Sequence, residues 1–121
     1  MKLLITGASG SIGSNLVPYF KSLKYNVVCL KSDIRNYEDL RDEVIINSDA
    51  NYIIHLAAVV CSIPSELAGR HAYDVNVKGT YHLAELAREF NMKFCYFSTT
   101  VLYKTRLKII SEDSIKEPPS F

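Results

Sequence analysis

Four short apolar runs mark out the chain. Each run is almost continuously apolar instead of alternating with polar residues, which is typical of strands buried on both faces of a parallel sheet. The runs are KLLIT, NVVCL, NYIIHLA and KFCYFS, at residues 2–6, 26–30, 51–57 and 93–98. We therefore expect four well-buried strands of one parallel sheet.

Apolar residues at helical spacing separate these runs. Residues 11–24 carry apolar side chains three and four apart with Pro18 among them, so this helix is expected to bend or to begin late. Asn36, followed by Asp39 in an acidic first turn, is typical of the N-cap of a helix that ends near Ile46.

The longest predicted helix covers residues 65–90, and its apolar stripe includes one amide. The stripe consists of Ala72, Val75, Asn76, Gly79, Leu83, Leu86 and Phe90. Regular alternation of strands and helices predicts an α/β fold: a doubly wound parallel sheet of four to five strands, with right-handed crossovers and helices on both faces. Residues 104–121 show no clear period, and we expect them to be mostly loop.

The composition is that of an ordinary single globular domain. Of the 121 residues 48% are apolar and 22% charged, and the formal net charge is +1. The basic residues are spread along the chain, which argues against nucleic acid or an anionic membrane as a partner. Cys29, Cys61 and Cys95 form neither a disulfide framework nor a metal-binding pair. We therefore expect a cytoplasmic protein without a metal site, with Cys29 and Cys95 as small buried side chains.

Three glycines lie between the first strand and the first helix, in the sequence TGASGSIG. Such a turn needs glycine where the chain turns tightly, where a pyrophosphate approaches bare backbone, and where helix and strand pack closely. The helix N-terminus then presents unpaired N–H groups to the phosphates. Gly7, Gly10 and Gly13 therefore predict a dinucleotide-binding turn. The spacing is GxxGxxG, and a turn of small residues without a ligand stays open as the alternative.

The end of the second strand bears on the choice of dinucleotide. An acidic residue that binds the ribose hydroxyls is expected about 20 residues after the glycines. The sequence has Lys31 and Ser32 there, and a cation beside a hydroxyl suits a 2′-phosphate better than a ribose diol. This favours NADP over NAD, unless Lys31 is an ordinary solvated residue at the end of a strand.

Five motifs in sequence order carry a family resemblance. They are TGASGSIG at 6–13, SDIRN at 32–36, HLAA at 55–58, NVKGT at 76–80 and FSTTVLY at 97–103. They are similar to motifs of the extended short-chain dehydrogenase/reductase family, the NAD-dependent nucleotide-sugar epimerases, dehydratases and reductases. The resemblance covers the whole chain and implies a Rossmann-type NAD(P)-binding domain over residues 1–121. Because the second strand passes almost directly into SDIRN, the layout is most similar to the dTDP-4-dehydrorhamnose reductase branch.

The resemblance implies a cofactor site for NAD or NADP. The pyrophosphate would lie on the glycine turn, the adenine beside an accepting carboxylate, and the ribose and nicotinamide against small residues that follow the third strand. Together with Lys31, Asn76 and Ser98, the candidate cofactor-binding residues are Gly7, Ser9, Gly10, Ser11, Ile12, Gly13, Asp33, Ile34, Leu56, Ala57 and Ala58. Asp33 as a solvated turn residue, and the alanines as plain core, remain the alternatives.

Two polar residues are expected inside the fold. Asn76 lies on the apolar stripe of the longest helix, where an amide without partners would cost about 1–3 kcal/mol. We expect it to tie adjacent strand ends together near the cofactor, or to make a merely structural hydrogen bond. His55 is interpreted as a core histidine with satisfied hydrogen bonds, with a catalytic histidine as the alternative, and His71 and His82 as surface or packing residues.

The catalytic residues of the family are only partly present. In the family a tyrosine, assisted by a lysine four residues later, moves a proton on the sugar oxygen during hydride transfer, and a Ser or Thr holds the same oxygen. Thr99 matches the latter residue, unless it only caps a turn. None of the eight tyrosines has a lysine four residues later. In the family the tyrosine follows a proline-bearing segment similar to EDSIKEPPSF, so we expect the chain to stop just before its catalytic helix.

The predicted function is therefore the dinucleotide-binding part of a nucleotide-sugar epimerase, dehydratase or reductase, inactive by itself and acting on a nucleotide sugar only in the full-length enzyme. The alternatives are a non-catalytic NAD(P)-binding sensor or regulatory module, and a scaffold that acts only through protein contacts. Without the expected helix and next strand, Phe94, Tyr96 or Phe97 would stay partly exposed. We therefore expect self-association or marginal stability.

Overall fold

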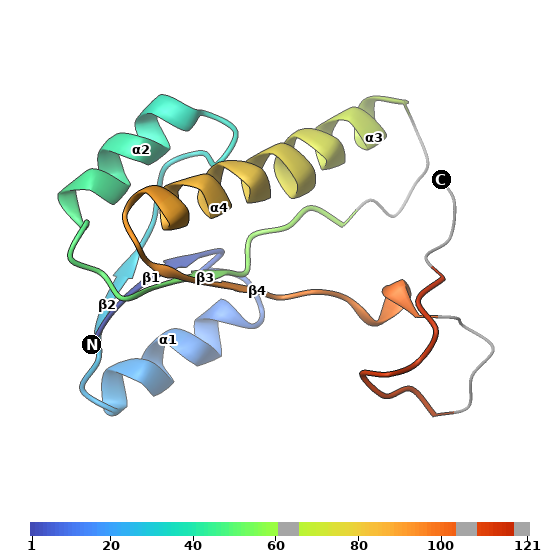
Figure 1. Ribbon diagram of the computed structural model, residues 1–121, viewed down its shortest axis with the longest axis horizontal. Coiled ribbons are helices and arrows are strands. Elements are labelled where there is room, and N and C mark those ends of the chain that lie inside the picture. Colours follow the sequence, from blue (N-terminus) through green and yellow to red (C-terminus); the bar gives the residue numbers. More distant parts are fainter. Residues whose placement is uncertain (61–65, 104–108, 118–121) are drawn as a thin grey trace.

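The structure, a computed structural model, describes residues 1–60, 66–103 and 109–117 (Figure 1). Outside these ranges lie Cys61, the predicted start of the longest helix at residue 65, and residues 104–108 and 118–121 of the expected loop. No helix among the described residues is both long and apolar enough to cross a membrane.

The strands of the described chain form one parallel sheet in the order β2-β1-β3-β4. The strands are β1 (Lys2–Thr6), β2 (Asn26–Cys29), β3 (Tyr52–His55) and β4 (Lys93–Tyr96). The chain leaves β1 toward one edge to form β2 and then returns to the other side of β1 to form β3. This reversal creates a switch point at the carboxyl ends of β1 and β3, which is where open α/β sheets bind ligands.

Helices cover both faces of the sheet (Figure 1). Helix α1 (Gly13–Ser22) lies on one face, and α2 (Tyr37–Ile46) lies on the other. The second face also carries α3 (Glu66–Tyr73), a π-helical turn η1 (Asp74–Gly79) and α4 (Thr80–Glu89), which follow one another directly. The predicted doubly wound α/β fold is therefore confirmed, and the longest predicted helix contains a π-turn that its apolar stripe did not indicate.

Alternate residues of β1 supply two separate cores. Leu3 and Ile5 point toward α1 and pack with its apolar side chains, among them Leu16 and Phe20. Leu4 belongs to the larger core on the other side, where buried residues of β3, α2 and α4 join it. Those partners are Ile53, Leu40, Val44, Leu83, Leu86 and Ala87. The continuously apolar sequences of β1 and β3 reflect this burial on both faces.

Two helix starts follow the sequence signals. Helix α1 begins at Gly13, two residues later than the predicted limit, and contains Pro18. The side chain of Asn36 accepts a hydrogen bond from the backbone N–H of Asp39 and caps α2, as predicted.

The two edge strands, β2 and β4, are less buried than the sequence predicted. β2 and β4 are only partly buried, because each has a strand neighbour on one side alone. The prediction that Cys29 and Cys95 are buried is accordingly wrong, since Cys29 is half-buried and Cys95 exposed. The predicted exposure of aromatic residues at β4 is confirmed: Tyr96 is 53% and Phe97 43% exposed.

The described residues after β4, 97–103 and 109–117, have little regular structure. A short 3-10 helix covers Thr100–Leu102, and Tyr103 forms an isolated antiparallel bridge with Lys116. The described residues 109–117 contain no helix or longer strand.

Candidate cofactor site

A groove of about 340 Å³ opens at the carboxyl ends of β1, β2 and β3, at the switch point of the sheet. Its lining residues are Thr6, Gly7, Ser9, Gly10, Leu30, Ser32, Asp33, Ile34, Leu56, Ala57, Ala58 and Val75. The groove thus brings together three candidate segments that are far apart in sequence: the glycine turn, Asp33 with Ile34, and the small residues after β3. Thr6, Leu30 and Val75 were not among the predicted residues.

The three glycines of the turn differ in what a side chain at each position would contact. Gly7 has a φ of +68°, and a Cβ there would lie 2.6 Å from the backbone N of Ala57. A Cβ at Gly13 would collide with the carbonyl oxygen of Gly7 and lie 2.6 Å from Cα of Ala8. A Cβ at Gly10 would meet only the Gly7 oxygen, at 3.3 Å. The fold itself therefore requires Gly7 and Gly13, whereas Gly10 leaves bare backbone that faces the groove.

The start of α1 adds hydrogen-bond donors beside this bare backbone. Ile12 occupies the N-cap position, and no side chain of the described residues caps this end. N–H groups at the start of a helix have no partner within the helix, and they attract anions. In α1 the N–H of Ser14 already donates to the Gly10 carbonyl at 2.9 Å, which leaves the N–H groups of Ser11, Ile12 and Gly13 for a ligand. Exposed Ser11 and Ile12 lie at this end without lining the groove. Bare backbone next to an uncapped helix start fits the pyrophosphate of a dinucleotide.

The end of β2 is held by a carboxylate that the sequence analysis missed. Both oxygens of Glu43, on α2, lie 3.0 Å from the backbone N of Lys31, and one lies 2.9 Å from the N of Ser32. Burial raises the pKa of Glu43, but these backbone hydrogen bonds outweigh it and bring the pKa below its ordinary value. The Lys31 side chain is exposed and does not line the groove, whereas Ser32 does.

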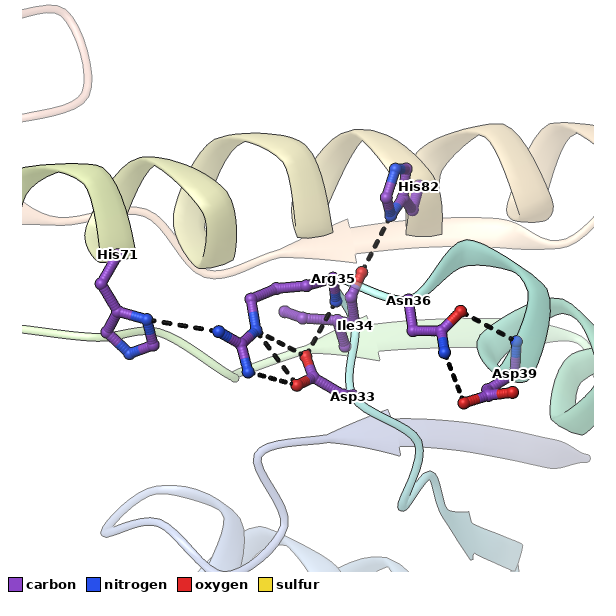
Figure 2. Close-up of polar contacts among 7 residues, drawn as sticks. All are labelled: Asp33, Ile34, Arg35, Asn36, Asp39, His71 and His82. Atoms are coloured by element: carbon purple, nitrogen blue, oxygen red, sulfur yellow. Dashed lines mark hydrogen bonds and ion pairs between the residues drawn. The ribbon is translucent and has the colours of Figure 1, made fainter.

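Asp33 lies at the rim of the groove and is paired with Arg35 (Figure 2). Nε of Arg35 lies 3.0 Å from both carboxylate oxygens, Nη2 lies 2.5 Å from Oδ2, and the Arg35 backbone N–H donates to Oδ1. Hydrogen bonds from the Arg35 guanidinium and backbone lower the pKa of Asp33 to about 2. The carboxylate therefore stays ionised and accepts hydrogen bonds at neutral pH.

Two histidines hold the same loop, as Figure 2 shows. Nδ1 of His82, on α4, lies 2.9 Å from the carbonyl oxygen of Ile34, and Nδ1 of His71 lies 3.5 Å from Nη1 of Arg35. The prediction that these histidines are packing or surface residues is confirmed. Arg35 was missed, because a pair two residues apart leaves no periodic signal in the sequence.

Asn76 anchors the chain that follows β3. Its Oδ1 accepts from the backbone N–H of Val59, and its Nδ2 donates to the Val59 carbonyl, both at 2.8 Å. Asn76 does not itself line the groove, but Leu56, Ala57 and Ala58, just before Val59, do. Its amide thus holds one wall of the groove in place.

Thr99 and Ser98 lie beyond β4 and outside the groove lining. Both are exposed, and Oγ1 of Thr99 accepts from the N–H of Val101 at 3.3 Å at the start of the 3-10 helix. Because β4 pairs in parallel with β3, both residues lie at the same edge of the sheet as the groove.

Several curated proteins and solved structures are similar to this chain. The dTDP-4-dehydrorhamnose reductase of Aggregatibacter actinomycetemcomitans is 35% identical over 106 residues, which are 84% of this chain and 36% of the relative. A solved dTDP-4-dehydrorhamnose reductase from Clostridium acetobutylicum is 26% identical, with a TM-score of 0.84, over 98% of this chain and 43% of that one. The Bordetella bronchiseptica enzyme WbmG, solved in complex with NAD and UDP, shares the fold at 20% identity, with a TM-score of 0.81, over 96% of this chain and 43% of that one.

The chain spans about a third of the length of the curated relatives it matches. Its match to the family described as NAD dependent epimerase/dehydratase covers residues 3–120. Since this match includes nearly every residue and the fold agrees with it, the chain belongs to the NAD-dependent epimerase/dehydratase family, as its motifs predicted.

Proposed function

We propose that the chain is the dinucleotide-binding part of a nucleotide-sugar epimerase, dehydratase or reductase, and that its groove holds NAD or NADP. The observation that carries this proposal is the groove at the switch point, where the bare backbone of Gly10 lies beside the uncapped start of α1. The membership of an NAD-dependent family and the NAD bound to WbmG support it. A bound nicotinamide would supply the hydride acceptor or donor.

Different residues of the chain are assigned to different parts of the dinucleotide. In this proposal the backbone N–H groups of Ser11, Ile12 and Gly13 bind the pyrophosphate, and Gly10, whose own N–H donates to the Gly7 carbonyl, lets it approach because it has no side chain. The ionised Asp33 accepts from the adenine amino group. Leu56, Ala57 and Ala58 form an apolar wall that excludes water, and the two alanines are small enough to let the nicotinamide half lie close. Thr99 holds the sugar oxygen that loses or gains a proton.

The catalytic Tyr-x-x-x-Lys of the family is absent from these 121 residues. We therefore expect the chain alone to bind cofactor without transferring hydride. The coding sequence directly after Phe121 tests this expectation: a Tyr-x-x-x-Lys there supports the enzyme, and a stop codon would favour a non-catalytic binding module.

The end of β2 favours NADP over NAD. The carboxylate that reaches this strand end, Glu43, already accepts from two backbone N–H groups, so it is a poorer acceptor for a ribose diol. The exposed Lys31, just outside the groove lining, offers a cation to a 2′-phosphate. We expect NADP to bind more tightly than NAD, and Lys31→Ala to reduce the difference.

Calorimetric titration of the chain with NAD and with NADP tests the proposal. Gly10→Ala places a methyl group on the groove backbone with only one close contact, so the variant should fold and bind about tenfold more weakly, a loss of about 1.4 kcal/mol. Gly69→Ala is the matched control, because a Cβ there meets nothing within 4 Å on helix α3. Absence of binding to the unmodified chain at millimolar cofactor would contradict the proposal.

A further inference from the structure

The most deeply buried ionisable side chain of the described core lies next to the groove. His55, at the end of β3, is 1% exposed. Its Nδ1 lies 2.7 Å from Oγ1 of Thr6, at the end of β1, and its Nε2 lies 2.9 Å from Oγ1 of Thr80, at the start of α4. The rings of Phe94 and Tyr96 lie beside the imidazole, with centroids at 6.1 and 5.8 Å. The predicted core histidine is confirmed, and it joins three elements around the switch point.

The partners of the two threonines fix the position of the imidazole proton. The Thr80 hydroxyl donates to the carbonyl of Asn76 at 2.7 Å, so its oxygen can only accept from His55, which requires a proton on Nε2. Burial lowers the pKa of His55 to about 4, so the ring is neutral at pH 7 and Nδ1 is unprotonated. Nδ1 therefore accepts from the Thr6 hydroxyl, whose oxygen in turn accepts from the N–H of Ala57 at 3.3 Å.

The hydrogen bonds consequently run in one direction, from Ala57 through Thr6, His55 and Thr80 to Asn76. The two ends of this chain of hydrogen bonds are the two anchors of the groove wall. The Thr6 hydroxyl oxygen accepts from the N–H of Ala57. The side-chain amide of Asn76 bonds to both the N–H and the carbonyl of Val59, each at 2.8 Å. Every member between the anchors has a partner, as a buried polar network requires.

From this geometry we propose that His55 is a positioning residue for the cofactor groove: its Nε2–H tautomer connects Thr6 to Asn76 and so fixes the wall formed by residues 56–59. The inference rests on the proposed function, because it assigns His55 to the dinucleotide site. It goes further in giving a buried side chain, which does not line the groove, control over the affinity of the groove for its ligand.

The close packing of the wall explains why small displacements matter. A Cβ at Gly7 would lie 2.6 Å from the backbone N of Ala57, so the glycine turn and the wall touch backbone to backbone. The π-turn η1 carries Asn76, which holds the other end of the wall at Val59. At the end of this turn the Thr80 N–H donates to Val77, whereas the Thr80 hydroxyl donates to the Asn76 carbonyl. Breaking the His55–Thr80 contact thus loosens the turn that carries the Asn76 amide.

Thr80 is the best position for a test, because it does not line the groove. Thr80→Val keeps the shape but removes the hydroxyl, and we expect NADP to bind about five- to tenfold more weakly to this variant. Thr80→Ser restores the hydroxyl and should restore binding to within about twofold of the unmodified chain. Val44→Ala, on the buried face of α2, is the control that loses stability but keeps the unmodified dissociation constant.

Nitrogen NMR of the imidazole provides a readout that does not depend on cofactor. The spectrum of the unmodified chain should show His55 neutral and protonated on Nε2 at pH 7, and Thr80→Val should alter the Nε2 signal. Protonation on Nδ1, or equal binding by the Thr80→Val and Thr80→Ser variants, would overturn the inference and leave His55 as a core residue alone. Failure of the unmodified chain to bind either dinucleotide would instead overturn the proposed function, and the positioning role with it.

Discussion

Replacing Asn76 by alanine removes a two-point clamp from the wall of the groove. The substitution leaves the N–H and the carbonyl of Val59, each bonded to the amide at 2.8 Å, without their partner. An unpaired buried polar group costs about 1–3 kcal/mol. Water reaches part of this half-buried site, and the better helix propensity of alanine offsets about 0.5 kcal/mol. We therefore expect Asn76→Ala to lower the free energy of unfolding by about 2 kcal/mol.

Urea denaturation followed by circular dichroism measures this loss. Asn15→Ala is the matched control, because the exposed Asn15 amide makes a single hydrogen bond, to the carbonyl of Ser11 just before α1. We expect the control to change the free energy of unfolding by less than about 0.5 kcal/mol, as surface substitutions usually do. An equally small change for Asn76→Ala would refute the claim that the clamp stabilises the wall.

Asn76→Asp separates the two hydrogen bonds of the clamp. The new carboxylate can still accept from the N–H of Val59, but it places an oxygen against the Val59 carbonyl where the amide placed a donor. Protonation supplies an O–H donor at that point, so the folded state favours the protonated form. The destabilisation of Asn76→Asp should therefore be largest near pH 7 and shrink as the pH falls below about 5. A deficit that does not change with pH would contradict this geometry.

Three further predictions concern other parts of the structure. Burial lowers the pKa of His55 from 6.5 to about 4, so the unfolded chain takes up the proton first; stability should fall by about 3 kcal/mol as the pH drops from 6.5 to 4, and His55→Gln should flatten that part of the curve. Arg35→Ala should raise the pKa of Asp33 from about 2 toward 3.8 in a carboxyl NMR titration, with little change in stability because the pair is half-exposed. Tyr96 and Phe97 at the open edge of β4 should make the chain associate in sedimentation experiments, whereas a monodisperse monomer with a high melting temperature would speak against this.

Much of the fold was predictable because its elements follow local rules. The Asn36 cap, the apolar runs of β1 and β3, and the late start of α1 each depend on residues within one turn or one strand. Burial of the edges was not predictable in this way. The sequence of β4 is nearly as apolar as that of β1, but its place at the end of the strand order leaves Cys95 exposed.

The candidate site likewise has one part that local motifs predicted and another part that depends on tertiary packing. The glycine turn, Asp33 and the alanines after β3 stand in recognisable motifs, and the structure brings them to one groove. Glu43 reaches the end of β2 only because α2 folds back against it, twelve residues along the chain. The contact of His55 with Thr80 spans 25 residues and depends on the π-turn that orients α4. Contacts of this kind arise from tertiary packing, so a single sequence carries no local signal for them.

The central claim is that the groove at the switch point binds a nicotinamide dinucleotide through backbone amides. The most direct measurement is a titration of the ¹⁵N-labelled chain with NADP and with NAD, followed through the backbone amide signals. The account predicts the largest shifts at Gly10, Ser11, Ile12 and Gly13, with smaller shifts at Ala57 and Ala58. Unchanged amide signals at millimolar dinucleotide, or shifts confined to the opposite edge of the sheet, would contradict it.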